Sequence, residues 1–299
     1  MIDFVAPVLD PKCLPVRARV RSFGVVIDLL ADSDAALAGL LRCVPPTTVP
    51  SASRRVDREY AVRSKGRCRC GQAHRSNDLF INGSWRKSGH DLGELAPVLQ
   101  RNMKLWVAEN APQFVFVHAG AVGWRGRAIL VPGSSLSGKT TLTAALLERG
   151  ATYLSDEYAV LDERGRVHPY AQPLAVRETP NDLQIDTPAE HFGACRQDMA
   201  LSVAMVIVTR YRSTAHWSAR PMRSVQVTKA LLTHTVAAQR SPERSMRVVT
   251  TVGLQARGYG HVRGEAGATA ERILATFDVS HLATFGFVEP GVRNHASVQ

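Results

Sequence analysis

Long apolar segments are missing from this 299-residue sequence. Its longest apolar runs, such as LSVAMVIV at positions 201–208, are far shorter than the roughly 20 residues that a membrane-spanning helix needs. The first residues, MIDFVAPVLDPKCLPVRAR, also lack the basic segment and the long apolar segment of a secretory signal peptide. We therefore expect a soluble, cytoplasmic protein with no membrane partner.

Cysteines are few and odd in number, five in all. In a chain without a secretory signal, we expect free thiols rather than disulfides. The stretch CRCGQAH brings Cys68, Cys70 and His74 together, but no second ligand cluster follows at a metal-binding spacing. A polar loop or hairpin explains the stretch as well, and whether it binds anything stays open.

Acidic residues are outnumbered, with 26 Asp and Glu against 37 Lys and Arg, which gives a net charge of +11. The excess gathers in residues 51–87 and 210–263. Such a field can attract nucleic acid, nucleotide phosphates or an acidic protein, and it can also be no more than a basic solvated surface. Aromatic residues make up only 6% and no nucleic-acid-binding motif is present, so we do not expect a nucleic-acid partner.

The N-terminal third predicts a mixed α/β unit. Alternating apolar positions predict strands at 16–30, 58–64 and 77–88, and three- and four-residue spacing predicts helices at 32–44 and 91–112. Asp32 or Ser33 is the expected N-cap, and Asn82-Gly83 is the expected hairpin turn. We place a soft boundary at about Pro112. It gives an N-terminal α/β domain, residues 1–112, whose role in substrate binding or assembly is left open.

Residues 113–299 predict a second, larger α/β domain. We expect strands at 114–124 and 127–131 joined by a tight turn at Arg125-Gly126, then a helix that Gly150 closes. Further along, the sequence predicts a buried strand at 201–211, a helix within 224–239, a strand-rich segment at 246–264 and a last helix at 267–277. Because strands and helices do not alternate strictly, the sheet need not be purely parallel.

The sequence GSSLSGKT at 133–140 fits the phosphate-binding pattern G-x-x-x-x-G-K-[ST], and it lies between an expected strand and an expected helix. Gly133 and Gly138 can adopt angles barred to other residues, so successive N–H groups can surround a phosphate. Lys139 would bring its charge to the β- and γ-phosphates, and Thr140 would offer a hydroxyl to Mg²⁺. The other nucleotide contacts that we expect are Ser134, Ser135, Leu136, Ser137 and Thr141.

A glycine-containing loop before an ordinary helix is the alternative explanation. The strand and the helix that flank the loop favour nucleotide phosphate binding. The loop alone does not say which acceptor receives a phosphate.

A pair of acids, Asp156 and Glu157, follows the expected helix where the chain returns to the sheet. One carboxylate can hold Mg²⁺ while the other accepts a proton from an attacking hydroxyl. A solvated acidic turn is the alternative. His118 comes at the end of the apolar run FVFV, where a histidine is usually structural, but it precedes the glycine loop closely.

The segments HAGAV, GSSLSGKTTL and ERGATYLSDEYAVLD resemble the catalytic domain of bacterial HPr kinase/phosphorylase, and resemble more closely the HPr-kinase-like serine kinases, some of which accompany peptide-biosynthesis genes. The resemblance is specific from position 118 to about 177. It implies a P-loop fold related to phosphoenolpyruvate carboxykinase, ATP and Mg²⁺ as cofactors, and a serine as acceptor. It also implies Asp156 as the catalytic base, Glu157 as a metal-placing acid, and His118 and Lys139 as active-site residues.

The chain departs from that family after the acid pair. The family's Arg-Gly-Leu-Gly segment is replaced by AVRETPND, in which Arg177 is retained as a phosphate contact and Ala175 stands where an acid is expected. The reverse, phosphorylase reaction is therefore not expected.

We conclude that the sequence predicts an ATP- and Mg²⁺-dependent serine kinase acting on a peptide or protein. A non-catalytic ATP-binding regulatory or assembly module and a small-molecule kinase remain alternatives. The oligomeric state is open, a homo-oligomer included.

Overall fold

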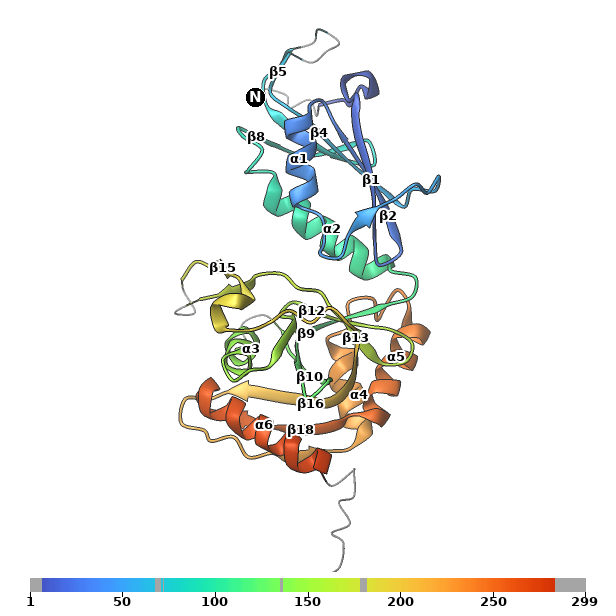
Figure 1. Ribbon diagram of the computed structural model, residues 1–299. Coiled ribbons are helices and arrows are strands. Elements are labelled where there is room, and N and C mark those ends of the chain that lie inside the picture. The colour runs from blue at the N-terminus through green and yellow to red at the C-terminus, as the bar shows by residue number, and fades with distance from the viewer. Residues whose placement is uncertain (1–6, 68–70, 72, 135–136, 178–181, 283–299) are drawn as a thin grey trace, which may run out of the picture.

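The computed structural model describes residues 7–67, 71, 73–134, 137–177 and 182–282. Figure 1 shows two lobes, one above the other, each built on its own β-sheet. We call residues 7–110 the N-terminal unit and residues 115–282 the C-terminal unit. The protein is therefore a mixed α/β protein with more than one sheet. None of the helices in the described part of the chain is both long and apolar enough to cross a membrane.

The N-terminal unit contains a six-stranded sheet in the order β3-β1-β2-β4-β7-β8. Only β2 and β4 run parallel, and the other neighbours are antiparallel. The predicted turn is confirmed, because Asn82 and Gly83 join β7 to β8 with positive φ angles of 49° and 73°. The strands are β1 (Val16–Ser22), β2 (Val25–Ala31), β3 (Val49–Pro50), β4 (Arg58–Arg63), β7 (Asn77–Ile81) and β8 (Ser84–Gly89).

Two helices, α1 (Asp34–Arg42) and α2 (Ala96–Asn110), cover one face of this sheet (Figure 1). Ser33 is the N-cap of α1, since its hydroxyl accepts a hydrogen bond from the Ala36 N–H. The helix predicted at 91–112 is shorter than expected. Pro97 lies in the first turn of α2, and proline has no N–H and clashes with the carbonyl four residues earlier, so the helix cannot extend back to 91.

The C-terminal unit contains an eight-stranded sheet in the order β10-β9-β12-β13-β16-β18-β17, with β11 beside β9. Because β10 also pairs with β16, the strands β10, β9, β12, β13 and β16 form a closed ring. The strands are β9 (Val115–Trp124), β10 (Arg127–Pro132), β11 (Thr152–Ser155), β12 (Tyr158–Leu161), β13 (Arg166–His168), β16 (Leu201–Tyr211), β17 (Arg220–Met222) and β18 (Arg257–Arg263).

Helices pack on both faces of β10 and β16. Ile129 and Val131 face α3 (Lys139–Leu147) and α6 (Ala266–Leu282), whereas Ala128 and Leu130 face α4 (Ser224–Thr233) and α5 (Pro242–Gln255). This alternation explains the continuous apolar runs of both strands, which are buried on both sides. The short elements are β5 (Gly66–Arg67) with β6 (Ala73–His74), β14 (Leu174–Val176) with β15 (Ile185–Thr187), η1 (Pro11–Cys13) and η2 (Ala189–Phe192).

The prediction of a strand-rich segment at 246–264 is wrong for the first part of that segment. Residues up to Gln255 belong to α5, and only β18 is a strand. The β-branched run VVTTV favours a strand by propensity, but Ser245, Val248, Val249 and Val252 are buried at helical spacing. Burial of that face therefore outweighs the local preference.

The two units share one hydrophobic cluster. Leu99 and Met103 of α2 belong to the same cluster of buried residues as Phe116, Tyr158 and Tyr170 of the C-terminal unit. The helix α2 thus lies at the junction, directly above β9 and β12 in Figure 1.

Candidate functional site

Four strands of the C-terminal unit end at one edge of the sheet. β10, β16 and β18 are parallel neighbours, and β11 runs in the same direction because both it and β10 are antiparallel to β9. The carboxyl ends of such strands are the usual place for a ligand in an α/β sheet. The glycine loop follows β10 here, and the acid pair follows β11.

The glycine loop joins β10 to α3, as the sequence predicts. Its first residue is fixed to the sheet, because the Gly133 N–H donates to the His118 carbonyl at 3.1 Å. A Cβ on Gly133 would lie 2.6 Å from the Ser137 hydroxyl oxygen, so a side chain here would require that hydroxyl to move. Gly138 has φ +79°, the left-handed region that favours glycine. Ser135 and Leu136 lie outside the described residues.

The helix α3 begins at Lys139, directly after Gly138. Its first N–H groups have no partner within the helix, and its dipole adds positive potential at this end. Lys139 and Thr140 are partly buried, Ser137 likewise, while Ser134 and Thr141 are exposed. Backbone, dipole and ammonium charge therefore converge on the loop, as an anion site requires.

The acid pair interrupts a strand. Ser155 pairs with Ala121 and Tyr158 pairs with His118, so the register with β9 is the same on both sides of Asp156 and Glu157. It shifts earlier, between Tyr153 and Ser155. Asp156 consequently comes opposite Gly120 of β9, which the sequence reasoning did not single out. A Cβ on Gly120 would collide with the Thr143 hydroxyl. The same Cβ would lie 3.3 Å from Lys139 Cγ and 3.8 Å from Asp156 Oδ1. A glycine inside a strand is the signal for such a close approach.

Asp156 is directed at the glycine loop. The Thr140 hydroxyl donates to Asp156 Oδ2 at 2.6 Å, and the Asp156 residue is only 8% exposed. Burial raises the pKa of Asp156 to about 6, even though the Thr140 hydrogen bond and the Lys139 charge act in the opposite direction. Asp156 Oδ1 and Thr143 Oγ1 are buried and have no well-aligned hydrogen-bond partner among the described residues, although the nearby Thr143 hydroxyl also lowers the pKa of Asp156.

Glu157 is bound to another part of the chain. Lys104 of α2 donates from Nζ to Glu157 Oε2 at 2.9 Å. The Ser155 hydroxyl accepts from the N–H groups of Glu157 and Tyr158 and so fixes the bend. The metal-placing role predicted for Glu157 stays a prediction, because the carboxylate beside Thr140 is that of Asp156.

His118 of β9 lies between a residue of β12 and the residue that ends helix α4. Tyr158 is opposite it on β12, with ring centroids 4.8 Å apart, and His234 is opposite it on the other side, where the His234 carbonyl accepts the His118 N–H at 2.8 Å. Desolvation lowers the pKa of His118 and of His234, and the Lys139 charge adds to both shifts. The pKa of each imidazole therefore lies below the ordinary value for histidine, although the His118 side chain is exposed. No motif in the sequence marks His234.

Arg263, at the end of β18, was also missed. Its Nη2 donates to the Gly138 carbonyl at 2.8 Å, its Nη1 donates to the Gly264 carbonyl at 2.8 Å, and it is 2% exposed. Its guanidinium lies 5.2 Å from the ring centroid of Tyr211, at the end of β16. Arg263 thus holds the residue that precedes α3. No local motif marks it, because the contact joins residues 125 positions apart.

The predicted phosphate contact Arg177 and His74, from the stretch whose role was left open, lie elsewhere. Arg177 directly follows β14 and is exposed, and its role as a phosphate contact stays a prediction. His74 belongs to β6, whereas Cys68 and Cys70 lie outside the described residues. Within the described ranges, no three His, Cys, Asp or Glu side chains form a group that could hold a metal ion by themselves.

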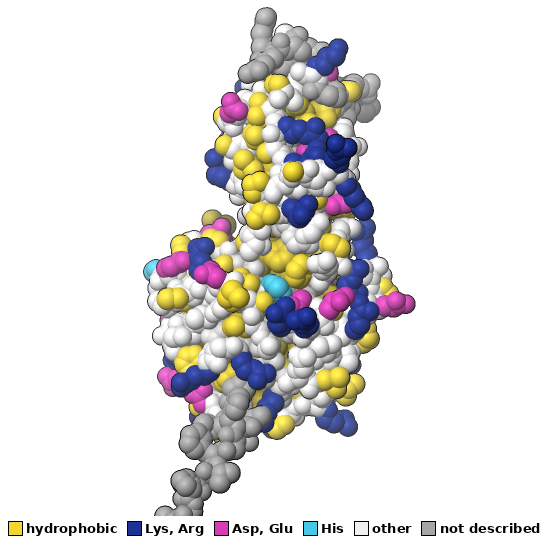
Figure 2. Space-filling view, turned by 45° about the vertical axis from the view of Figure 1, so that its right-hand side comes forward, with side chains coloured by type: hydrophobic (Ala, Val, Ile, Leu, Met, Phe, Trp, Pro, Cys, Tyr) yellow, Lys and Arg dark blue, Asp and Glu magenta, His cyan; other side chains and the backbone are white. Residues whose placement is uncertain are grey.

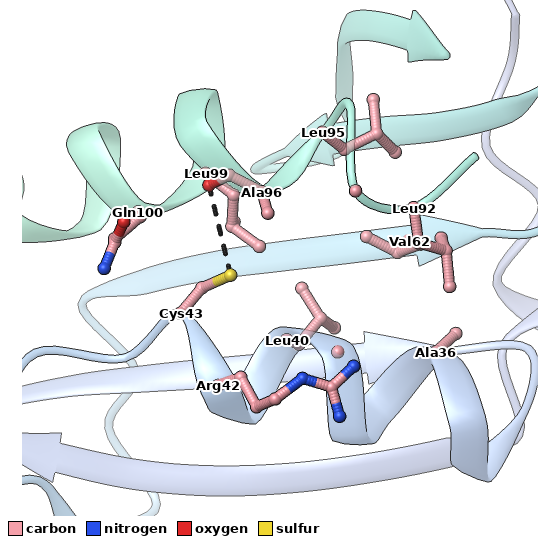
Figure 3. A pocket seen from close by; sticks show the side chains of 12 residues that line it. Ala36, Leu40, Arg42, Cys43, Val62, Leu92, Leu95, Ala96, Leu99 and Gln100 are labelled. Carbon is pink, nitrogen blue, oxygen red and sulfur yellow. Dashed lines mark hydrogen bonds between the residues drawn. The ribbon is translucent and has the colours of Figure 1, made fainter. Parts of the chain in front are cut away.

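A separate cavity of about 280 Å³ lies between α1 and α2 (Figure 3). Leu40, Leu95 and Leu99 line it, and Cys43 Sγ lies 4.0 Å from the Ala96 carbonyl oxygen across it. These residues belong to the core of the N-terminal unit, and none of the predicted site residues that the structure describes lines the cavity. It is therefore distinct from the candidate site.

The surface around the junction carries both charge signs. Figure 2 shows lysine and arginine side chains running from the upper lobe across the narrow waist, with acidic side chains and a histidine on the face just below. The lysine and arginine side chains on this surface can attract an anionic ligand.

The residues at the loop fit Mg²⁺ and a nucleotide triphosphate. Mg²⁺ takes one or two protein oxygens and completes its shell with water and phosphate oxygens. The Thr140 hydroxyl and the unpartnered Asp156 Oδ1 are such oxygens, and Lys139 together with the start of α3 provides the positive charge.

No protein-family model matches the sequence, and no curated protein matches it either. Among solved structures, the Hpr(Ser) kinase/phosphatase from Coxiella burnetii is similar, with a TM-score of 0.36 and 12% identity over 57% of this chain and 93% of that chain. At this TM-score the likeness supports no conclusion about function, so what the site can do follows from its own geometry.

Proposed function

We propose that this protein is an ATP- and Mg²⁺-dependent kinase that transfers the γ-phosphate to a serine hydroxyl of a peptide or protein. The observation that supports it most is the 2.6 Å hydrogen bond between Thr140, beside the glycine loop, and the buried Asp156. Phosphoryl transfer needs mainly positioning and charge neutralisation, and this edge of the sheet offers groups for both.

The phosphates would be held by the loop N–H groups, the start of α3 and the Lys139 ammonium. Arg263 supports this arrangement from behind by fixing the Gly138 carbonyl. Bound ATP supplies the phosphoryl group, and Mg²⁺ neutralises its charge. Thr140 and Asp156 are the residues that we assign to the metal, since their oxygens lie together.

Asp156 is also the group that we assign to proton removal. In the metal-free protein the Asp156 carboxyl has a pKa of about 6 and is largely ionised at pH 7. The oxygen that does not hold the metal would accept the proton of an approaching hydroxyl. Gly120, which has no side chain, leaves the room that Thr143, Lys139 and Asp156 occupy next to β9. The choice of serine on a peptide rests on the family resemblance of the motifs around positions 118–177.

The proposal is tested with γ-labelled ATP and serine-containing peptides, with phosphate on the peptide read by mass spectrometry. We expect transfer by the wild type, ATP binding without transfer by Asp156→Asn, and wild-type transfer by the control Asp186→Asn, which changes an exposed acid on β15. Transfer by Asp156→Asn at the wild-type rate would remove Asp156 as the base. A wild type that binds ATP and modifies no acceptor would instead be a regulatory module.

A further inference from the structure

One side chain of the N-terminal unit reaches the candidate site. Lys104 projects from α2 and donates to Glu157 Oε2 at 2.9 Å. The Lys104 side chain is 16% exposed and the Glu157 side chain 38% exposed. The lysine is thus the better buried of the two, and it lies where the two units share a hydrophobic cluster.

Glu157 lies close enough to the loop for its charge to matter there. It directly follows Asp156, and its charge and that of Lys139 both act on His118. A carboxylate in this place repels an incoming polyphosphate unless a cation compensates it, and two charges several ångströms apart still interact at a half-buried site. Among the described residues, the cation in contact with Glu157 is Lys104.

We propose that Lys104 is a positioning residue that holds and neutralises Glu157, so that the glycine loop can accept a polyphosphate. The N-terminal unit then has a defined task, because it supplies a charge that the C-terminal unit lacks at this point. This inference rests on the proposed nucleotide binding at the loop.

A double-mutant cycle tests it, with the Kd of Mg·ATP measured by calorimetry. We expect Lys104→Met to raise Kd about tenfold, which corresponds to about 1.4 kcal/mol. Glu157→Gln should bind at least as tightly as the wild type, and Lys104→Met/Glu157→Gln should return to within about threefold of it. Lys87→Met is the matched control, since Lys87 is a lysine of the same unit that donates to the Glu94 carbonyl.

The double variant separates two ways in which Lys104 could act. If the ammonium touched the phosphates directly, removing Glu157 as well would not restore binding. A double variant as weak as Lys104→Met, or a Lys104→Met variant with wild-type Kd, would overturn the inference. Weaker binding by Glu157→Gln alone would do so too, because Glu157 would then be a metal ligand.

Two further measurements exclude a purely structural effect. Salt screens charge repulsion, so the defect of Lys104→Met should shrink when the ionic strength rises to about 0.5 M. If Lys104→Met does not fold, Lys104→Arg and Glu157→Gln carry the test, and Lys104→Arg should keep the wild-type Kd. If the wild type itself binds no ATP, the proposed function fails, whereas a defect in the cycle alone leaves that function intact.

Discussion

The Thr140 hydroxyl donates a hydrogen bond of 2.6 Å to Oδ2 of Asp156, which lies 16 positions further along the chain. Thr140 lies in the first turn of α3 and Asp156 directly follows β11, which returns the chain to the same edge of the sheet. A hydroxyl at the start of α3 and a buried carboxylate thus meet beside a glycine loop. In P-loop NTPases, this pair of groups holds Mg²⁺.

The raised pKa of Asp156 makes the stability of the ligand-free protein depend on pH. The unfolded chain loses this proton near pH 4, and the folded chain keeps it until about pH 6. The contribution of Asp156 to stability therefore falls as the pH rises from about 4 to about 6, by at most about 3 kcal/mol. The amide side chain of Asp156→Asn cannot ionise. Denaturant unfolding should therefore show that the free energy of unfolding of this variant rises relative to that of the wild type between about pH 4.5 and about pH 7.5.

Asp162 provides a control of opposite sign. Desolvation raises its pKa, but hydrogen bonds from His168 and Arg166 outweigh this and lower it. The stability that Asp162 contributes is present above the pKa of the unfolded state and is lost as the pH falls. Asp162→Asn should therefore be destabilised relative to the wild type at pH 7.5. An Asp156→Asn variant whose difference from the wild type does not change with pH would contradict the raised pKa.

Gly120→Ala should damage both the fold and the site. The added methyl group would meet the Thr143 hydroxyl and crowd Lys139. We expect the free energy of unfolding to fall by about 1 to 3 kcal/mol, as overpacking does elsewhere, and ATP binding to weaken. Gly39→Ala is the matched control, because a Cβ there would lie 3.9 Å from the nearest atom, Arg42 Nη2, on helix α1. The free energy of unfolding of that variant should rise by about 0.5 to 1 kcal/mol.

Much of the local structure around the site was predictable from the sequence. The loop, the helix that begins at Lys139 and the strand end before Asp156 follow from motif spacing and apolar patterning. The helix α5 could not be predicted in this way, because its β-branched residues favour a strand unless tertiary burial is known. The bonds Lys104–Glu157 and Arg263–Gly138 join residues 53 and 125 positions apart. Such contacts depend on how whole elements pack, which no short motif encodes.

Arg263→Met should loosen the loop. The substitution leaves the Gly138 carbonyl with the Leu142 N–H as its donor and removes the hydrogen bond from the guanidinium. A hydrogen bond from a charged group contributes about 1.5 to 3 kcal/mol. We expect a lower melting temperature and a Kd for Mg·ATP about tenfold higher, equivalent to about 1.4 kcal/mol. The control is Arg212→Met, an exposed arginine whose backbone N–H pairs with the Arg263 carbonyl. Equal effects of the two substitutions would show that Arg263 has no special relation to the loop.

Calorimetric titration of Mg·ATP into the wild type and into Lys139→Ala tests the central claim most directly. Lys139 is partly buried at the start of α3, and its replacement removes one full charge from the loop. We expect saturable binding by the wild type and no measurable binding by Lys139→Ala at an unchanged melting temperature. Equal affinity of the two proteins, or no binding by the wild type, would contradict a phosphate site at residues 133–141.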